Sequence, residues 1–303
     1  MLKRSLFFVN PFHLSIKNRQ LVVQNKESGK TKSIPVEDIG YVILDNRQIT
    51  ITQSVAEIFS EYNVALIFCN EKHHPVSMMF NLDSNTIQGQ LFEAQIGASV
   101  ALKKNLWKQT IKAKITNQAL LLGKLEKQNN ALLQYARDVK SGDSTGLEAR
   151  AARYYWQELF REISFKRERE GGQPNSMLNY AYAVLRAGTA KALCGSGLLP
   201  TLGIHHRNKY NAYRLADDIM EPYRPIIDEL VFATFKKFPD YEDLTSEIKM
   251  ELLTLLTLDV HINNQTRPLM IALSSTTASL ARCFNDESRK IKYPQLIMNY
   301  DND

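Results

Sequence analysis

Two adjacent histidines followed by a cluster of acidic residues make up the part of this chain best suited to chemistry. His205 and His206 precede a helix-like run that carries Asp217, Asp218 and Glu221. If the run is helical, Glu221 shares a face with Asp217 at i, i+4 and with Asp218 at i, i+3. Like charges repel, so a cation or a basic group is expected opposite them. The spacing therefore predicts either a metal site or an internal salt network.

The salt-network interpretation has candidate partners nearby. Arg207, Arg214 and Arg224 surround the acidic run, and a histidine near a loop is more often a hydrogen-bonded structural residue than a ligand. Glu148 is a further candidate acid, near the start of a helix predicted over 147–163. A glutamate in a first helical turn also offsets the helix dipole, so Glu148 alone indicates little.

Two regions of different character must position these residues. Short runs rich in β-branched and aromatic residues, separated by polar turns, predict a small N-terminal β-sandwich over 1–80. Apolar periodicity predicts a larger all-α domain over 81–303, which contains the candidate acids and histidines and so is the expected catalytic domain, and the fold class is α+β. We expect helices over 92–128, 147–163, 175–194, 215–237 and 246–258, with a bend or an end at Pro222 or Pro225. No glycine-rich phosphate loop follows a strand, which disfavours dinucleotide and P-loop chemistry.

Charge is concentrated in the middle of the chain. The 303 residues include 38 Lys/Arg and 32 Asp/Glu, a net charge of +6. Residues 102–170 hold 15 of these basic and 8 of these acidic residues. Such a region suits a polyanionic substrate, although a solvated helical face has the same composition. Three widely spaced cysteines argue against a disulfide framework or a zinc knuckle. No apolar run is long enough for a membrane span, so a cytoplasmic protein without a membrane partner is expected.

Three segments in a fixed order resemble one family. They are the Glu148 segment, then Asn175-Ser-Met-Leu-Asn-Tyr-Ala-Tyr-Ala-Val-Leu, then His206-Arg-Asn-Lys-Tyr-Asn with Leu215-Ala-Asp-Asp-Ile-Met-Glu-Pro-Tyr-Arg-Pro. This order is similar to the CRISPR-associated integrase-endonuclease of the spacer-acquisition complex. The last run resembles the type II-like branch, whose signature has Phe where this chain has Tyr223. The resemblance covers essentially the whole chain.

The resemblance implies a set of site residues. By position, Glu148, His206 and Glu221 correspond to the family's catalytic metal ligands. His206 is preferred over His205 because the family pattern Gly-x-x-His-x-Asn is matched by Gly203, His206 and Asn208. Further residues are candidates to support these ligands: Asp218, which matches another acidic position and could serve a second metal, His205 and Asn208.

The implied chemistry is metal-dependent work on double-stranded DNA. Two carboxylates and an imidazole suit Mg²⁺ or Mn²⁺ better than zinc. In the family a DNA 3′-hydroxyl attacks a phosphodiester of the repeat and thereby inserts a spacer, in antiviral defence, and water could replace it in a nuclease reaction. The family also implies a homodimer through the β domain, a small partner subunit of the acquisition complex, and the effector nuclease of the same system as another partner. Candidate contacts to the DNA backbone are Arg150, Arg153, Arg161, Lys166, Arg167 and Arg169.

Two other functions remain open from the residues. A non-catalytic DNA-binding scaffold would use the acidic run only to pair with arginines, so metal removal would not change its function. A metal-dependent hydrolase of a smaller phosphorylated substrate would need an enclosed pocket, and the diffuse basic region argues against it.

Overall fold

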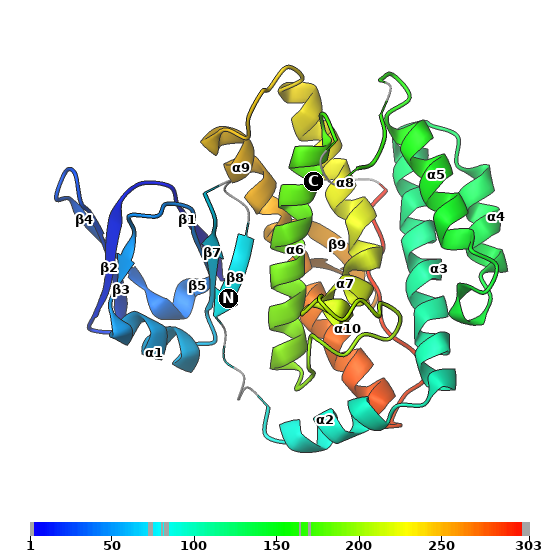
Figure 1. Ribbon diagram of the computed structural model, residues 1–303, viewed down its shortest axis with the longest axis horizontal. Coiled ribbons are helices and arrows are strands. Elements are labelled where there is room, and N and C mark those ends of the chain that lie inside the picture. The colour runs from blue at the N-terminus through cyan, green and yellow to red at the C-terminus, as the bar shows by residue number, and fades with distance from the viewer. Residues whose placement is uncertain are drawn as a thin grey trace. The chain divides into compact units, whose positions relative to one another are not determined.

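The chain divides into two compact units, residues 1–84 and 85–303. The computed structural model describes residues 3–71, 75–79, 81, 85–163, 165–168 and 171–298 (Figure 1). The expected order of a β region followed by a helical region is confirmed.

Within its described residues, the N-terminal unit consists of two four-stranded sheets and one α-helix. One sheet has the order β1-β5-β7-β8, in which β8 is antiparallel and the other pairs are parallel. The second has the order β4-β3-β2-β6, with β2 and β6 parallel. Their bounds are β1 Arg4–Phe8, β2 Phe12–Lys17, β3 Gln20–Asn25, β4 Thr31–Pro35, β5 Ile39–Leu44, β6 Thr50–Ile51, β7 Ala65–Cys69 and β8 Pro75–Met79, with a 3₁₀ turn at Val36–Asp38.

The helix α1, Gln53–Glu61, closes the core of this unit. Val55 and Phe59, at i, i+4, are its buried side chains and pack with Leu14 and Leu66 from the two sheets. All six residues of β5 are buried, as expected for a strand in the interior of a sheet. The strands β1, β8, β4 and β6 are the edges of the two sheets, each with one neighbouring strand among the described residues of this unit.

Helices make up most of the second unit. They are α2 Gln88–Gly97, α3 Val100–Lys124, α4 Asn130–Asp138, α5 Leu147–Leu159, α6 Asn175–Gly195, α7 Arg214–Met220, α8 Arg224–Lys237, α9 Ser246–Leu253 and α10 Leu269–Phe284. Shorter elements are 3₁₀ turns at Ser141–Asp143, Glu221–Tyr223 and Thr254–Thr257, and a hairpin of β9 Asp259–Ile262 and β10 Gln265–Pro268. None of the helices in the described ranges has the length and apolar character to cross a bilayer.

The helix α6 is the core of this unit. Most of its residues are buried, and it packs against α7, α8, α9 and α10. Small residues such as Ala187 and Gly188 allow the neighbouring helices to approach. The long helix α3 packs on α4 and α5 and also on α8 and the 3₁₀ turn that precedes it (Figure 1). Helix α3 therefore brings together elements from both halves of the helical sequence.

Two of the following elements differ from the sequence prediction, and one agrees with it. The helix expected over 92–128 is interrupted, because Ala98 and Ser99 are extended and the Ser99 hydroxyl accepts a hydrogen bond from Leu102 N–H at 3.1 Å to start α3. The run predicted over 215–237 bends at Glu221–Tyr223, in agreement with the expected effect of Pro222. The hairpin β9–β10 was not expected in an all-α domain.

Candidate active site

Glu148 lies in the first turn of α5, and a different carboxylate caps that helix. Asp143 accepts hydrogen bonds from Leu147 N–H at 2.9 Å and from Glu148 N–H at 3.0 Å. Gly146, with φ of 63°, supplies the left-handed turn just before the helix. Because Asp143 accepts from these two N–H groups of the first turn, the Glu148 side chain is not needed to cap them and can make other contacts.

Glu221 opens the 3₁₀ turn between α7 and α8, and this turn is tied to α3. The buried side chain of Asn117 on α3 donates a hydrogen bond to the carbonyl of Pro222 at 2.7 Å. The turn thus fixes Glu221 beside α3, and only 5% of its surface is exposed.

A lysine of α3 joins the two glutamates. Lys114 Nζ lies 2.7 Å from Glu148 Oε1 and 2.6 Å from Glu221 Oε2. The three side chains are 12%, 27% and 6% exposed, respectively. Arg224 Nε lies 2.9 Å from the other oxygen of Glu221. Two carboxylates from separate segments therefore contact one shared position, which the Lys114 ammonium fills.

The charges around Glu221 keep it ionised. Burial alone would raise the pKa of this carboxyl, but Arg224 and Lys114 outweigh burial and lower the pKa to about 2. Burial also disfavours the charged form of Lys114, yet the two glutamates raise its pKa above the ordinary value. At neutral pH Glu221, Lys114 and Arg224 are therefore charged.

His206 is oriented by the most deeply buried of the three acids. Asp218 is fully buried, and its Oδ1 lies 2.5 Å from His206 Nδ1. The Asp218 carboxylate also accepts hydrogen bonds from the N–H groups of Ile204 at 2.7 Å, His205 at 3.0 Å and His206 at 3.2 Å. The hydrogen bond to Asp218 raises the pKa of His206. With Nδ1 held by the carboxylate, Nε2 is the ring atom left for a ligand.

The loop around this histidine requires a glycine. A Cβ at Gly203 would meet Asp218 Oδ2 at 2.8 Å and the carbonyl of His206 at 2.9 Å. These distances are shorter than side chains tolerate, so glycine is needed for the Asp218 carboxylate to reach the loop backbone.

The other candidate residues have different surroundings. The ring of His205 stacks on Trp107 of α3 with centroids 4.0 Å apart and an interplanar angle of 1°. Asn208 accepts a hydrogen bond from Tyr210 N–H within an exposed turn. Asp217 pairs with Arg186, whose Nε is 2.6 Å away, and not with the arginines nearest in sequence. His205 and Asn208 thus have structural contacts, while His206 and Asp218 form one unit.

The family model for CRISPR associated protein Cas1 matches residues 7–238. The chain belongs to the Cas1 family. The CRISPR-associated endonuclease Cas1 of Neisseria meningitidis serogroup C (strain 8013) is 34% identical over 297 residues, covering 97% of this chain and 96% of that relative. The matched region contains Glu148, His206 and Glu221, so the family assignment made from these segments is confirmed.

Solved structures share this Cas1 fold. A casposase bound to its integration product superimposes with a TM-score of 0.82 and 18% identity, covering all of this chain and 96% of that one. A chain of a Cas6-RT-Cas1–Cas2 complex superimposes with a TM-score of 0.74 and 18% identity, over 95% of this chain and 35% of the longer chain. At these identities the similarity establishes the fold.

The residues of this Cas1 chain fit a hard divalent cation. Two carboxylates share one cation position, and the held Nδ1 of His206 leaves Nε2 free in the manner of metal-binding histidines. Among the described residues, no three His, Cys, Asp or Glu side chains already stand close enough together to hold an ion. The ammonium of Lys114 lies at the position where the two glutamates meet.

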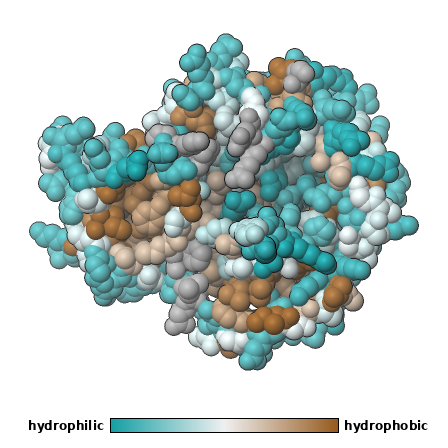
Figure 2. All heavy atoms as spheres, in the orientation of Figure 1, coloured by the Kyte–Doolittle hydropathy of each residue, from teal (hydrophilic) through white to brown (hydrophobic). Residues whose placement is uncertain are grey.

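The basic residues proposed to contact DNA fall into three groups. Arg150 and Arg153 are exposed on α5, with Arg150 Cζ 5.0 Å from the ring centroid of Tyr135. Arg161 and Lys166 are exposed and pair with Glu158 and Glu168, respectively. Arg167 is half-buried and donates to the side chains of Asn175 and Asn179, and Arg169 lies outside the described residues. On the face shown in Figure 2, hydrophilic residues predominate over α4 and α5.

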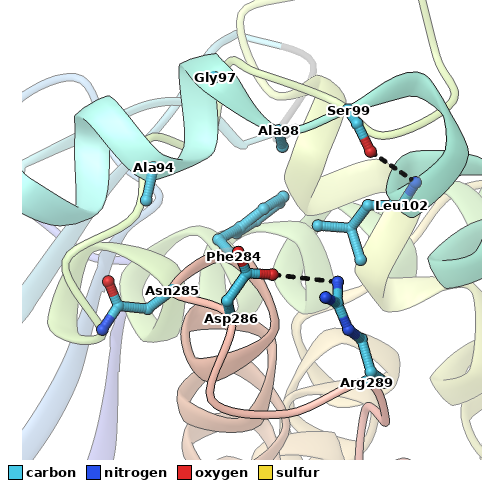
Figure 3. A pocket seen from close by; sticks show the side chains of 9 residues that line it. All are labelled: Ala94, Gly97, Ala98, Ser99, Leu102, Phe284, Asn285, Asp286 and Arg289. Atoms are coloured by element: carbon cyan, nitrogen blue, oxygen red, sulfur yellow. Dashed lines mark hydrogen bonds and ion pairs between the residues drawn. The ribbon is translucent and has the colours of Figure 1, made fainter.

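A separate cavity does not include this centre. It has a volume of about 500 Å³ and lies between the α2–α3 junction and the end of α10 (Figure 3). Its lining includes Leu102, Phe284 and the ion pair of Asp286 with Arg289, whose atoms are 3.0 Å apart. It contains none of the Cas1 site residues predicted from the sequence.

Sequence reasoning missed four residues of the centre. Lys114 and Trp107 lie on a lysine-rich helix whose other lysines are mostly exposed, so composition gave no sign of their role. Asp143 lies in the polar stretch just before α5, where an acid is a usable signal for a helix start. Asn117 had no signal in the sequence, since its partner is more than 100 residues away.

Proposed function

We propose that this chain is a divalent-metal-dependent DNA endonuclease and integrase that inserts short DNA spacers into a CRISPR array. The observation that carries the proposal is the meeting of Glu148 and Glu221 at one cation position, with His206, held by Asp218, close enough to interact electrostatically with Glu221. The names of its relatives, a Cas1 endonuclease and a casposase bound to an integration product, support this reaction class.

Glu148, Glu221 and Nε2 of His206 would hold Mg²⁺ or Mn²⁺. Such an ion polarises a phosphodiester and stabilises the charge that develops on its oxygens during displacement. Arg224 and Lys114 keep Glu221 ionised, Asp218 fixes the ring of His206, and Asp143 fixes the first turn of α5. Each ligand is therefore positioned by a charged or hydrogen-bonded neighbour on a rigid element.

The proposed reaction exchanges one phosphodiester for another. The 3′-hydroxyl oxygen of the incoming strand bonds to phosphorus in the target, and the bond from phosphorus to the target's 3′-oxygen breaks. The hydroxyl proton leaves to solvent, and the departing oxygen takes one up. With water as the attacking group, the same centre would cut DNA.

The partners proposed are double-stranded DNA, a second copy of the chain and the subunits of the acquisition system. Arg150 and Arg153 follow Glu148 on the same helix and are exposed, so they can contact phosphates close to the centre. Dimerisation through the β unit would use its open strand edges. The likeness to a chain of a Cas1–Cas2 complex supports a small partner subunit. The type II-like branch and the effector nuclease as partner rest on the run that ends at Pro225.

A strand-joining assay tests the proposed function. Purified protein, with a small partner subunit of such a system where required, is mixed with a supercoiled plasmid and a short duplex bearing free 3′-hydroxyls. We expect covalent joining with Mn²⁺ or Mg²⁺ and none after chelation, because the carboxylates need the ion to act on a phosphate. A duplex with 3′-deoxy ends is the matched control.

A non-catalytic scaffold is the second candidate, favoured by the ion pairs of Glu221 with Lys114 and Arg224. It predicts DNA binding that weakens with salt but is unaffected by chelation. Joining that continues in excess chelator, or joining of the 3′-deoxy duplex, would contradict the integrase proposal.

A further inference from the structure

Lys114 has an unusual set of ionic partners. Its ammonium bridges two carboxylates, with Nζ 2.7 Å from Glu148 and 2.6 Å from Glu221. Lys124, also on α3, forms an ion pair between packed helices with Glu229 of α8 at 2.7 Å. Lys114 therefore differs from an ordinary ion pair between packed helices.

The charges at this position balance without a metal ion. Glu148 and Glu221 contribute two negative charges, and Lys114 and Arg224 contribute two positive charges. Arg224 pairs with the other carboxylate oxygen of Glu221. Of these two cations, the Lys114 ammonium is the one that contacts both glutamates. The ammonium thus fills the position that joins the two carboxylates.

A divalent ion and this ammonium cannot share that position. Metal–oxygen distances of about 2.0–2.2 Å would bring the ion within contact of Nζ, and two like charges at such a separation repel strongly in a partly buried site. The lysine stem is flexible, and Glu148 is partly exposed, so the ammonium has a way out.

We propose that Lys114 is the resident counter-ion of the metal-free centre and that a divalent cation binds by displacing its ammonium from Glu148 and Glu221. This inference rests on the metal site of the proposed function. Its consequence is that Lys114 keeps the two acids together before the ion arrives and weakens the binding of the ion. Lys114 is a positioning residue in this role.

The test measures Mn²⁺ binding without DNA, by the loss of the free-ion signal in electron paramagnetic resonance. We expect the tightest site of Lys114→Met to bind Mn²⁺ about tenfold or more tightly than in the unchanged protein, a difference of at least ~1.4 kcal/mol. Lys112→Met, an exposed lysine of the same helix, is the matched control and should bind as the unchanged protein does. Glu221→Gln should lose this site and thereby identify it.

Thermal unfolding followed by circular dichroism gives a second readout. Without metal, Lys114→Met should unfold at a lower temperature, and Mn²⁺ should raise its midpoint more than it raises that of the unchanged protein. If Lys114→Met is unfolded without metal, recovery of its fold in Mn²⁺ supports the proposal, and failure to recover overturns it. If a folded Lys114→Met protein binds Mn²⁺ equally or more weakly than the unchanged protein, the inference about Lys114 is overturned, while the metal site of the proposed function is not. Absence of Mn²⁺ binding from every protein overturns the metal site itself.

Discussion

Glu221→Gln is expected to lower the rate of strand joining at least about 100-fold. Changing a residue that only supports a metal ligand typically lowers activity by about 10–100-fold, and loss of a ligand itself should cost at least as much. The pKa of Glu221 is about 2, so the carboxyl is ionised throughout the neutral range and glutamine removes a full negative charge. Glutamine has nearly the same shape, and it leaves Lys114 with Glu148 as its remaining acid. Initial joining rates at saturating Mn²⁺ measure the effect.

Glu229→Gln is the matched control for this change. Glu229 lies on α8 and pairs with Lys124 of α3 at 2.7 Å, which reproduces the interhelical lysine–glutamate contact away from the centre. We expect this variant to retain the joining rate within a few-fold, and the thermal midpoints of both variants show whether folding is affected. A Glu221→Gln protein that folds and joins at the unchanged rate would contradict the assignment.

Asp218→Asn is expected to reduce joining by about 10–100-fold, as is typical for the carboxylate partner of a metal-binding histidine. The same change should lower the free energy of unfolding by about 1–3 kcal/mol. The amide has a single accepting oxygen, whereas the two carboxylate oxygens serve the N–H groups of Ile204 and His205 on one side and His206 on the other. One of the two sets of donors therefore faces an amide N–H, which weakens the hold of the loop on the ring of His206. Joining rates and urea unfolding midpoints measure the two effects.

The Asp217→Asn variant distinguishes a loss of joining caused by His206 from one caused by lower stability. Asp217 is the adjacent buried acid, but its partners are the side chains of Arg186 and Asn211 and not the loop of His206. It should cost stability while joining stays within a few-fold of the unchanged rate. An equal loss of joining in both variants would show that Asp218 acts through general stability and not through His206.

The sequence predicted the order of the two units and most of the helices because these depend on local patterns. Short runs rich in β-branched and aromatic residues indicate the strands. The bend at Glu221–Tyr223 follows from a proline in the middle of a helical run. The hairpin β9–β10 was missed although Val260 and Ile262 alternate with exposed residues and Asn263-Asn264 forms the turn with φ of 54° and 60°. Strands of four residues are too short to stand out among helices.

The sequence could not predict the contacts that join distant segments. Glu148, His206 and Glu221 were proposed from the resemblance, and their local settings, a helix start and a loop before a helix, agree with the structure. The acids that pair with Lys114 of α3 lie 34 and 107 positions away along the chain, and no local pattern contains that information. Helix α3 also supplies Trp107 beneath His205, a contact across nearly 100 residues.

The most direct test of the central claim is the anomalous diffraction of Mn²⁺ in crystals of the protein. We predict one strong peak with carboxylate oxygens of Glu148 and Glu221 and Nε2 of His206 at about 2.0–2.3 Å. The ammonium of Lys114 should then have moved away from both glutamates. A strong peak elsewhere, with Lys114 still between Glu148 and Glu221, would contradict the assignment of these residues as a metal centre.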